Sequence, residues 1–194
     1  MMYRIDERPF GKSWDEWATQ WWKWFLSIPK DNHPAHDKTG ERAHLNQNDP
    51  NVWFLAGTTG GFAERTVVIP VDRSVFFPVI NITTSYLENP SLKNEEDMSS
   101  FINGHMMEIA KKEATIDGEP ILISENNRAR SPLFQFAFPT NNIFGTHDGK
   151  TQGIGDGYWI FLKPLLKGTH YIRTSGACMS GKVQIDTTIK LVVE

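Results

Sequence analysis

Four side chains in one polar segment have the chemistry of metal ligands. His33, His36, Asp37 and His44 lie within residues 30–50, KDNHPAHDKTGERAHLNQNDP. Neutral imidazole and carboxylate groups are ligands that zinc and similar divalent ions accept. However, Pro34 separates the first two histidines and no regular element fixes their spacing, which is more typical of a solvated loop. A divalent metal site and a plain polar loop therefore remain as alternative interpretations.

No familiar catalytic motif accompanies this segment. The sequence contains no Walker A, G-x-S-x-G, H-E-x-x-H or G-x-G-x-x-G pattern. A Ser-His-Asp set can be assembled on paper from Ser175, His105 and Asp156, but composition does not select it over many others. The single cysteine, Cys178, excludes an intramolecular disulfide and a cysteine-based metal site. A non-catalytic protein is therefore favoured over an enzyme.

The distribution of charged and apolar residues bears on the kinds of partner and on the compartment expected for this protein. The 194 residues carry 20 basic and 23 acidic side chains without a basic cluster, so nucleic-acid binding is not expected. No run of 18 apolar residues predicts a membrane span. The start, MMYRIDERPFGKSW, lacks the apolar centre of a signal peptide, which together with the lone cysteine predicts a cytoplasmic protein.

A tryptophan-rich helix is expected over residues 13–28. Ser13 and Glu16 have the spacing of a capping box, and Pro29 ends the helix. The apolar residues fall on one stripe at helical spacing, which is typical of a face packed on a sheet: Trp14, Trp17, Ala18, Trp21, Trp24, Phe25 and Ile28. Trp22 lies at the edge of this stripe. We therefore expect Trp22 to be exposed and treat it as a candidate ligand-binding residue.

The rest of the chain predicts strands. Residues 52–81 read as three central strands joined by turns at Gly57–Gly61 and Pro70–Arg73. A helix inserted at 99–114, with His105 on its apolar face, a hairpin turn at Asp117-Gly118 and a loop over 139–157 follow. Strands at 158–194 complete the pattern, with His170 expected to bond back to a preceding corner. We predict a single mainly-β domain, 1–194: a Greek-key-like antiparallel β-sandwich, Ig-like or jelly-roll-like, of seven to ten strands.

The chain resembles an uncharacterised group of bacterial proteins over nearly its whole length. The matching segments are Trp14–Pro29, Val52–Gly57, Ile69–Asn81, Ser131–Phe134 and Pro164–Gly176. The group has no established activity, so the resemblance implies no catalytic residue. Many of its members look exported and have cysteines near the positions of Ala43 and Val67. This chain has none there, which argues against a secreted location.

Three functions remain open. The favoured one is a non-catalytic module that binds a small molecule, a glycan or a protein through loops on a rigid sandwich. The second is a metal-dependent enzyme, a hydrolase, in which at least three of the ligands above or His105, His147 and Asp148 converge. The third is a structural protein that forms homo-oligomers through Trp22 or a sheet edge.

Overall fold

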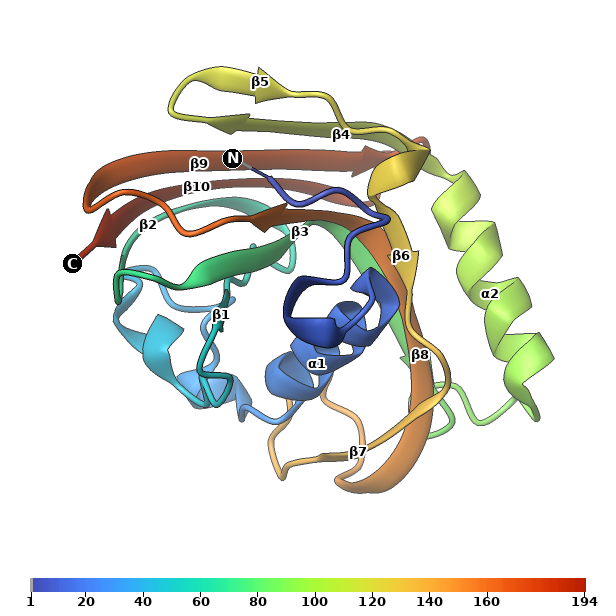
Figure 1. The fold of residues 1–194 in the computed structure, drawn as a ribbon. Helices are drawn as coiled ribbons and strands as arrows, with labels where there is room; N and C mark the ends of the chain where they lie inside the picture. The colour runs from blue at the N-terminus through green and yellow to red at the C-terminus, as the bar shows by residue number, and fades with distance from the viewer. Residues whose placement is uncertain (1) are drawn as a thin grey trace.

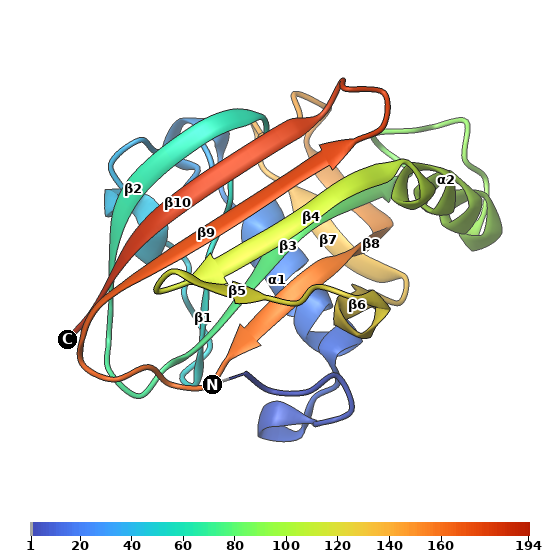
Figure 2. The same ribbon diagram turned by 90° about the horizontal axis from the view of Figure 1, so that it is seen from above.

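A computed structural model describes residues 2–194 and shows a mainly-β sandwich of two five-stranded sheets (Figure 1). We call these sheet A and sheet B. The helix α1, Trp14–Leu26, lies on the face of sheet A that points away from sheet B (Figure 2). The order of layers is therefore helix, sheet A, sheet B, and the predicted sandwich with an N-terminal helix is confirmed.

Sheet A has the order β1-β3-β8-β6, and β7 pairs with the part of β8 beyond β6. Its strands are β1 Val52–Phe54, β3 Ser74–Ser85, β6 Arg128–Arg130, β7 Phe134–Phe138 and β8 Gly149–Leu162. The short β1 runs parallel to β3, and all the other pairs are antiparallel. The predicted loop over 139–157 is therefore wrong in its second half, because β8 begins at Gly149.

Sheet B has the order β2-β10-β9-β4-β5. Its strands are β2 Gly61–Ile69, β4 Ile109–Ile116, β5 Glu119–Ile121, β9 Gly168–Cys178 and β10 Gln184–Val193. The pair β2–β10 is parallel, so both sheets are mixed rather than purely antiparallel as predicted. The three central strands do exist, but they do not form one unit. The chain crosses from sheet A to sheet B after β1 and returns for β3.

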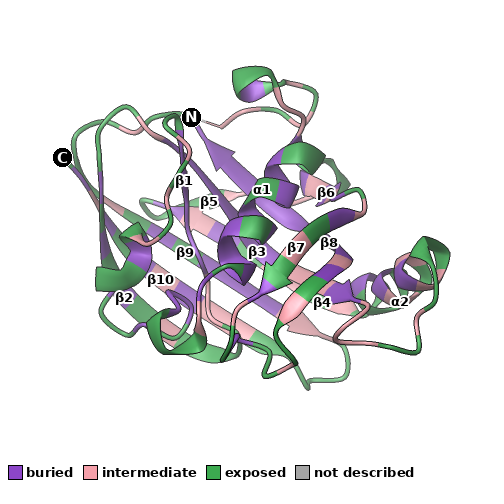
Figure 3. Cartoon of the chain, turned by 90° about the horizontal axis from the view of Figure 1, so that it is seen from below, coloured by how far each residue is buried: buried purple, intermediate pink, exposed green. Residues whose placement is uncertain are grey.

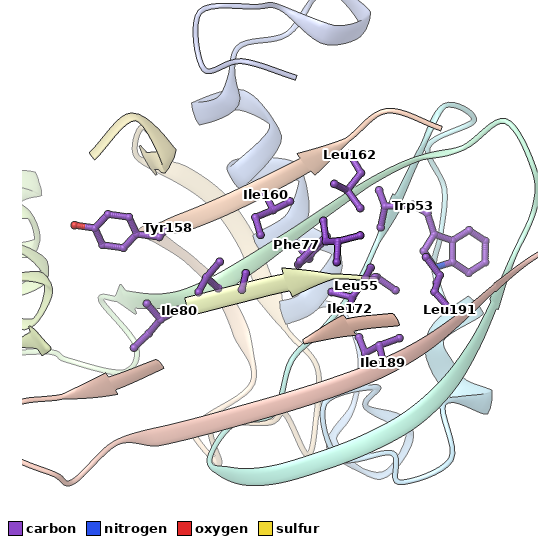
Figure 4. Close-up of a cluster of buried hydrophobic side chains, with 14 of the residues drawn as sticks. Trp53, Leu55, Phe77, Ile80, Tyr158, Ile160, Leu162, Ile172, Ile189 and Leu191 are labelled. Carbon is purple, nitrogen blue, oxygen red and sulfur yellow. The ribbon is translucent and has the colours of Figure 1, made fainter. Parts of the chain in front are cut away.

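Two apolar cores hold the layers together. One fills the space between the sheets, where Phe77, Ile160 and Leu162 of sheet A meet Ile189 and Leu191 of sheet B (Figure 4). The other joins α1 to sheet A, whose buried face toward the helix is visible in Figure 3. The capping box of Ser13 and Glu16 and the tryptophan stripe are confirmed. The expected exposure of Trp22 is wrong: it is 3% exposed because sheet A is wide enough to cover the edge of the stripe.

The inserted helix is placed differently from the prediction. Helix α2 spans Glu95–Met107 and is capped by Asn94, and residues from Ile109 onward are strand β4 instead. His105 is exposed rather than on the packed face, and its Nδ1 lies 2.9 Å from the carbonyl of Phe101. The acidic first turn and the Asn94 side chain explain the earlier start, since both stabilise a helix N-terminus.

Short elements complete the chain. The 3-10 segments are η1 Pro9–Gly11, η2 Lys30–Asn32, η3 Glu41–His44 and η4 Glu125–Asn127. The hairpin turn predicted at Asp117-Gly118 joins β4 to β5, with positive φ at both residues as such a turn requires. His170 bonds the carbonyl of Leu166 at 2.9 Å and Asp117 at 2.8 Å, so its predicted bond to the preceding corner is confirmed.

Candidate functional site

A cavity of about 200 Å³ lies where sheet A, sheet B and α1 meet. Trp21, Trp22 and Phe25 of α1 form one wall, and β9 and β10 form the opposite wall through Thr174 and Ile185. Its remaining lining residues are Gly57, Thr58, Thr59, residues 78–83 of β3, Phe144 and Val183. Phe144 and Val183 are 41% and 42% exposed. These two residues and the exposed Thr59 therefore lie at the opening of a partly enclosed, mainly apolar space.

The cavity exists because β1 is shorter than β3. Residues 52–54 of β1 pair with 74–76 of β3, and Leu55 adds a last hydrogen bond from its N–H to the carbonyl of Phe76. The chain then turns away toward sheet B, where the N–H of Thr58 donates to Oγ1 of Thr187 at 3.1 Å. The glycines around Thr58 and Thr59 permit this departure. Nothing from β1 follows the second half of β3.

Two buried donors at the cavity lack a hydrogen-bond partner. The indole Nε1 of Trp22 and the amide Nδ2 of Asn81 are fully buried, and no acceptor among residues 2–194 lies within reach of either. The remaining indoles, except that of Trp53, donate to backbone carbonyls. A buried donor without an acceptor costs about 1–3 kcal/mol. Among the described tryptophans of the core around α1, Trp22 is therefore the one whose indole lacks an acceptor.

No charged side chain lines the cavity. This is notable in a chain with 43 charged residues, the sum of 20 basic and 23 acidic ones. The polar groups present are threonine hydroxyls, the Asn81 amide, the Trp22 indole and the backbone of β3. Such a lining suits uncharged ligands, because an ion taken into it loses water without gaining a counter-charge.

The predicted metal ligands do not converge. The Nε2–H of the buried His33 donates to the carbonyl of Phe25 at 2.9 Å, and its Nδ1 accepts from Ala35 N–H at 3.1 Å. The Asp37 carboxylate accepts from Thr39, Gly40 and Arg42. His44 Nδ1 lies 2.6 Å from the carbonyl of Glu41. These side chains tie residues 30–44 into a fixed shape, with both nitrogens of His33 already used.

Electrostatics also disfavours a cation in this segment. Arg65 is 5% exposed, and its guanidinium donates to the carbonyl of Pro34 between the histidines. Burial, together with the nearby charges of His36 and Arg65, lowers the pKa of His33 to about 4. Burial, Lys30 and Arg65 likewise lower the pKa of His36. Across residues 2–194, no group of three or more His, Cys, Asp or Glu side chains has an arrangement that could hold a metal ion.

One residue of the histidine segment contacts a residue that lines the cavity. The Nε2 atom of His36 lies 3.2 Å from Oγ1 of Thr59, which lines the cavity. His105, His147 and Asp148, the other predicted metal ligands, belong to no group of side chains in residues 2–194 that could hold a metal ion. The cavity residues Asn81, Thr58 and Ile185 were missed by sequence reasoning. Pro78 inside a strand was the available signal, because proline in a sheet is typical of an edge or a bulge.

The most buried charge belongs to a structural cluster elsewhere. Asp156 on β8 is fully buried and accepts from Nη2 of Arg128 at 2.8 Å and from Nε of Arg130 at 2.8 Å. Both arginines also donate to the side chain of Asn103 on α2. The cluster joins β6, β8 and α2, and every strong acceptor in it is occupied.

Comparisons with known proteins leave the function open. No known protein family matches the sequence, and no curated protein matches it. A chain in the solved structure described as "Structure of PbICP-C in complex with falcipain-2" is similar at 12% identity, with a TM-score of 0.30. The match covers 74% of this chain and 99% of that one. No helix in the part of the chain that the structure describes is long and apolar enough to cross a membrane.

Proposed function

We propose that the protein is a non-catalytic binding module that takes an uncharged group into the cavity between α1 and the second half of β3. The observation that carries the proposal is the apolar, charge-free lining with two buried donors, Trp22 Nε1 and Asn81 Nδ2, that lack acceptors. A bound group whose oxygen acceptors reach these donors satisfies them, which converts a cost of the free protein into binding free energy.

The cavity fits this role better than an active site. A nucleophile activated by a base, or a general acid, requires an ionisable side chain at the reacting atoms. The lining offers threonine hydroxyls and amides instead. The walls are held by the aromatic core, since Trp21 donates to the carbonyl of Leu55 at 2.9 Å and stacks on Phe25 at 4.7 Å. The site is therefore preformed, as binding sites usually are.

Parallel peptide and glycan arrays test the proposal when probed with the wild type and two arginine variants. Val183→Arg places a charge at the opening of the cavity, and Val68→Arg makes the same change on β2 at a residue that is 50% exposed and outside the lining. We expect the wild type to bind to one of the two arrays. The Val183→Arg variant should lose this binding, and the Val68→Arg variant should keep it. Binding on neither array, or binding that both variants retain equally, refutes the proposal.

A further inference from the structure

The unpaired part of β3 is an open strand edge that faces the cavity. Residues 74 and 76 direct their backbone groups toward β1, as the bonds Ser74 N–H to Asn51 and Leu55 N–H to Phe76 show. The pairing with β8 shifts by one residue between Pro78 and Ile80, which marks a bulge. Beyond a one-residue bulge, the odd-numbered residues of β3 face the side where β1 ends.

Two hydrogen bonds fix this assignment. The N–H of Tyr86 donates to the carbonyl of Gln152 in β8. The backbone groups of the even-numbered residues Ile80 and Ile82 therefore also face β8. Ser85 accepts at its carbonyl from Asn89 N–H, so the odd-numbered residues face away. Asn81 and Thr83 therefore direct their N–H and C=O groups into the cavity. Within residues 2–194, neither backbone has a hydrogen bond on that side.

From this edge we infer that the ligand is an extended, uncharged peptide segment of a partner protein, which adds a strand to sheet A beside Asn81 and Thr83. The inference rests on the proposed function and names its ligand. Backbone pairing at an exposed edge is a recurring mode of peptide recognition, with affinity from the main chain and specificity from alternate side chains. The guest strand would continue the line of β1, which pairs with residues 74–76 of β3 (Figure 1), past the point where β1 ends.

The two walls account for both faces of such a strand. Side chains of a strand in the plane of sheet A alternate between α1 and sheet B. On the α1 side they meet Trp21, Trp22 and Phe25, and on the other side they meet Thr174 and Ile185. Asn81 pairs with Gly157, which alternates with Trp159 and Phe161 of the α1 core, so the Asn81 amide lies on the α1 side with Trp22. A guest Ser, Thr, Asn or Gln there places an acceptor on the same side of sheet A as both donors.

The size of the cavity agrees with a strand rather than a drug-sized molecule. Pockets for such molecules usually enclose about 300–1,000 Å³, and this cavity encloses about 200 Å³. That space takes one or two side chains, and backbone pairing along the edge supplies the remaining affinity. The absence of charge in the lining selects uncharged residues at those positions.

Backbone amide exchange followed by NMR tests the inference directly. In the free protein, the amides of Asn81 and Thr83 should exchange faster than those of Ile80 and Ile82, which are paired with β8. A random peptide display library should yield uncharged binders that Val183→Arg weakens about tenfold or more and Val68→Arg does not. These peptides should slow the exchange of Asn81 and Thr83 selectively.

Methylation of the bound peptide provides the second readout. N-methylation at alternate residues in one register should weaken binding about tenfold or more, and methylation in the other register should leave it nearly unchanged, because alternate amides of a strand face opposite sides. Equal effects in both registers overturn the inference.

Three other outcomes also overturn it. If the amides of Asn81 and Thr83 exchange slowly in the free protein at every protein concentration, the edge is already covered. Protection that appears only as the protein self-associates assigns the edge to a second copy of the chain. Glycan binding without peptide binding refutes the peptide ligand and leaves the proposed binding function standing.

Discussion

Two titratable groups, the buried His33 and the half-buried Glu88, should give this protein opposite pH dependences that nearly cancel. Burial lowers the pKa of His33 from 6.5 to about 4, and burial raises the pKa of Glu88 from 4.5 to about 7. The only side-chain hydrogen bond of Glu88 to another side chain in the described residues comes from Ser85 Oγ at 2.7 Å. The folded protein favours the neutral form of both side chains: unprotonated His33 and protonated Glu88.

The two signs follow from which state binds the proton. For His33 the unfolded chain binds the proton more tightly, so its contribution to stability is present above pH 6.5 and is lost as pH falls toward 4. For Glu88 the folded protein binds the proton more tightly, so its contribution is present below pH 4.5 and is lost as pH rises through 7. Between about pH 7.5 and about pH 5, each group changes the free energy of unfolding by about 2 kcal/mol, in opposite directions.

Urea unfolding of the wild type, His33→Gln and Glu88→Gln at both pH values measures these contributions. Acidification should destabilise Glu88→Gln by about 2 kcal/mol relative to the wild type and stabilise His33→Gln by a similar amount. The quantity compared is the change in the free energy of unfolding between the two pH values. The contributions of the other titrating groups cancel in this comparison because all three proteins share them, and so does any loss of stability that is the same at both pH values. Three parallel slopes refute the reasoning, and a flat slope for the wild type alone does not establish it.

Two further predictions concern stability. Asp156→Asn should lower the free energy of unfolding, measured in urea, by about 2–4 kcal/mol because it removes the charge that pairs with Arg128 and Arg130. Asp6→Asn, at an exposed ion pair, is the control and should leave the free energy of unfolding nearly unchanged. Gly155→Ala should destabilise by about 2 kcal/mol or more, since its Cβ meets Trp22 Nε1 at 2.0 Å. Gly104→Ala, with open space around its Cβ on α2, should be neutral or stabilising by melting temperature, and equal effects at both sites contradict the packing argument.

Patterns of near neighbours made much of the fold predictable. The helix over 14–26 follows from a capping box and a stripe at helical spacing, and the hairpin at Asp117-Gly118 follows from two residues that tolerate positive φ. The strands predicted over 158–194 are the end of β8, β9 and β10. Each of these signals is complete within a few residues, so the sequence alone determined them.

The placement of the histidines shows where such patterns stop. His33 has the composition of a ligand, but the carbonyl of Phe25 and the N–H of Ala35 use both of its nitrogens. An imidazole ring has the same chemistry whether it binds a metal or makes structural hydrogen bonds. Only its surroundings in the folded protein show which of the two it does. The expected exposure of Trp22 failed for the same reason, because burial depends on how far sheet A extends beneath the helix.

The candidate site was decided by the tertiary structure alone. β1 and β2 are near in sequence, yet one pairs with β3 in sheet A and the other with β10 in sheet B. This partition depends on contacts such as that of Thr58 with Thr187, 129 positions apart. Local propensity makes a strand but does not choose its neighbour, because pairing and burial involve residues that the chain brings together only when it folds. The open edge of β3 is the consequence of that choice.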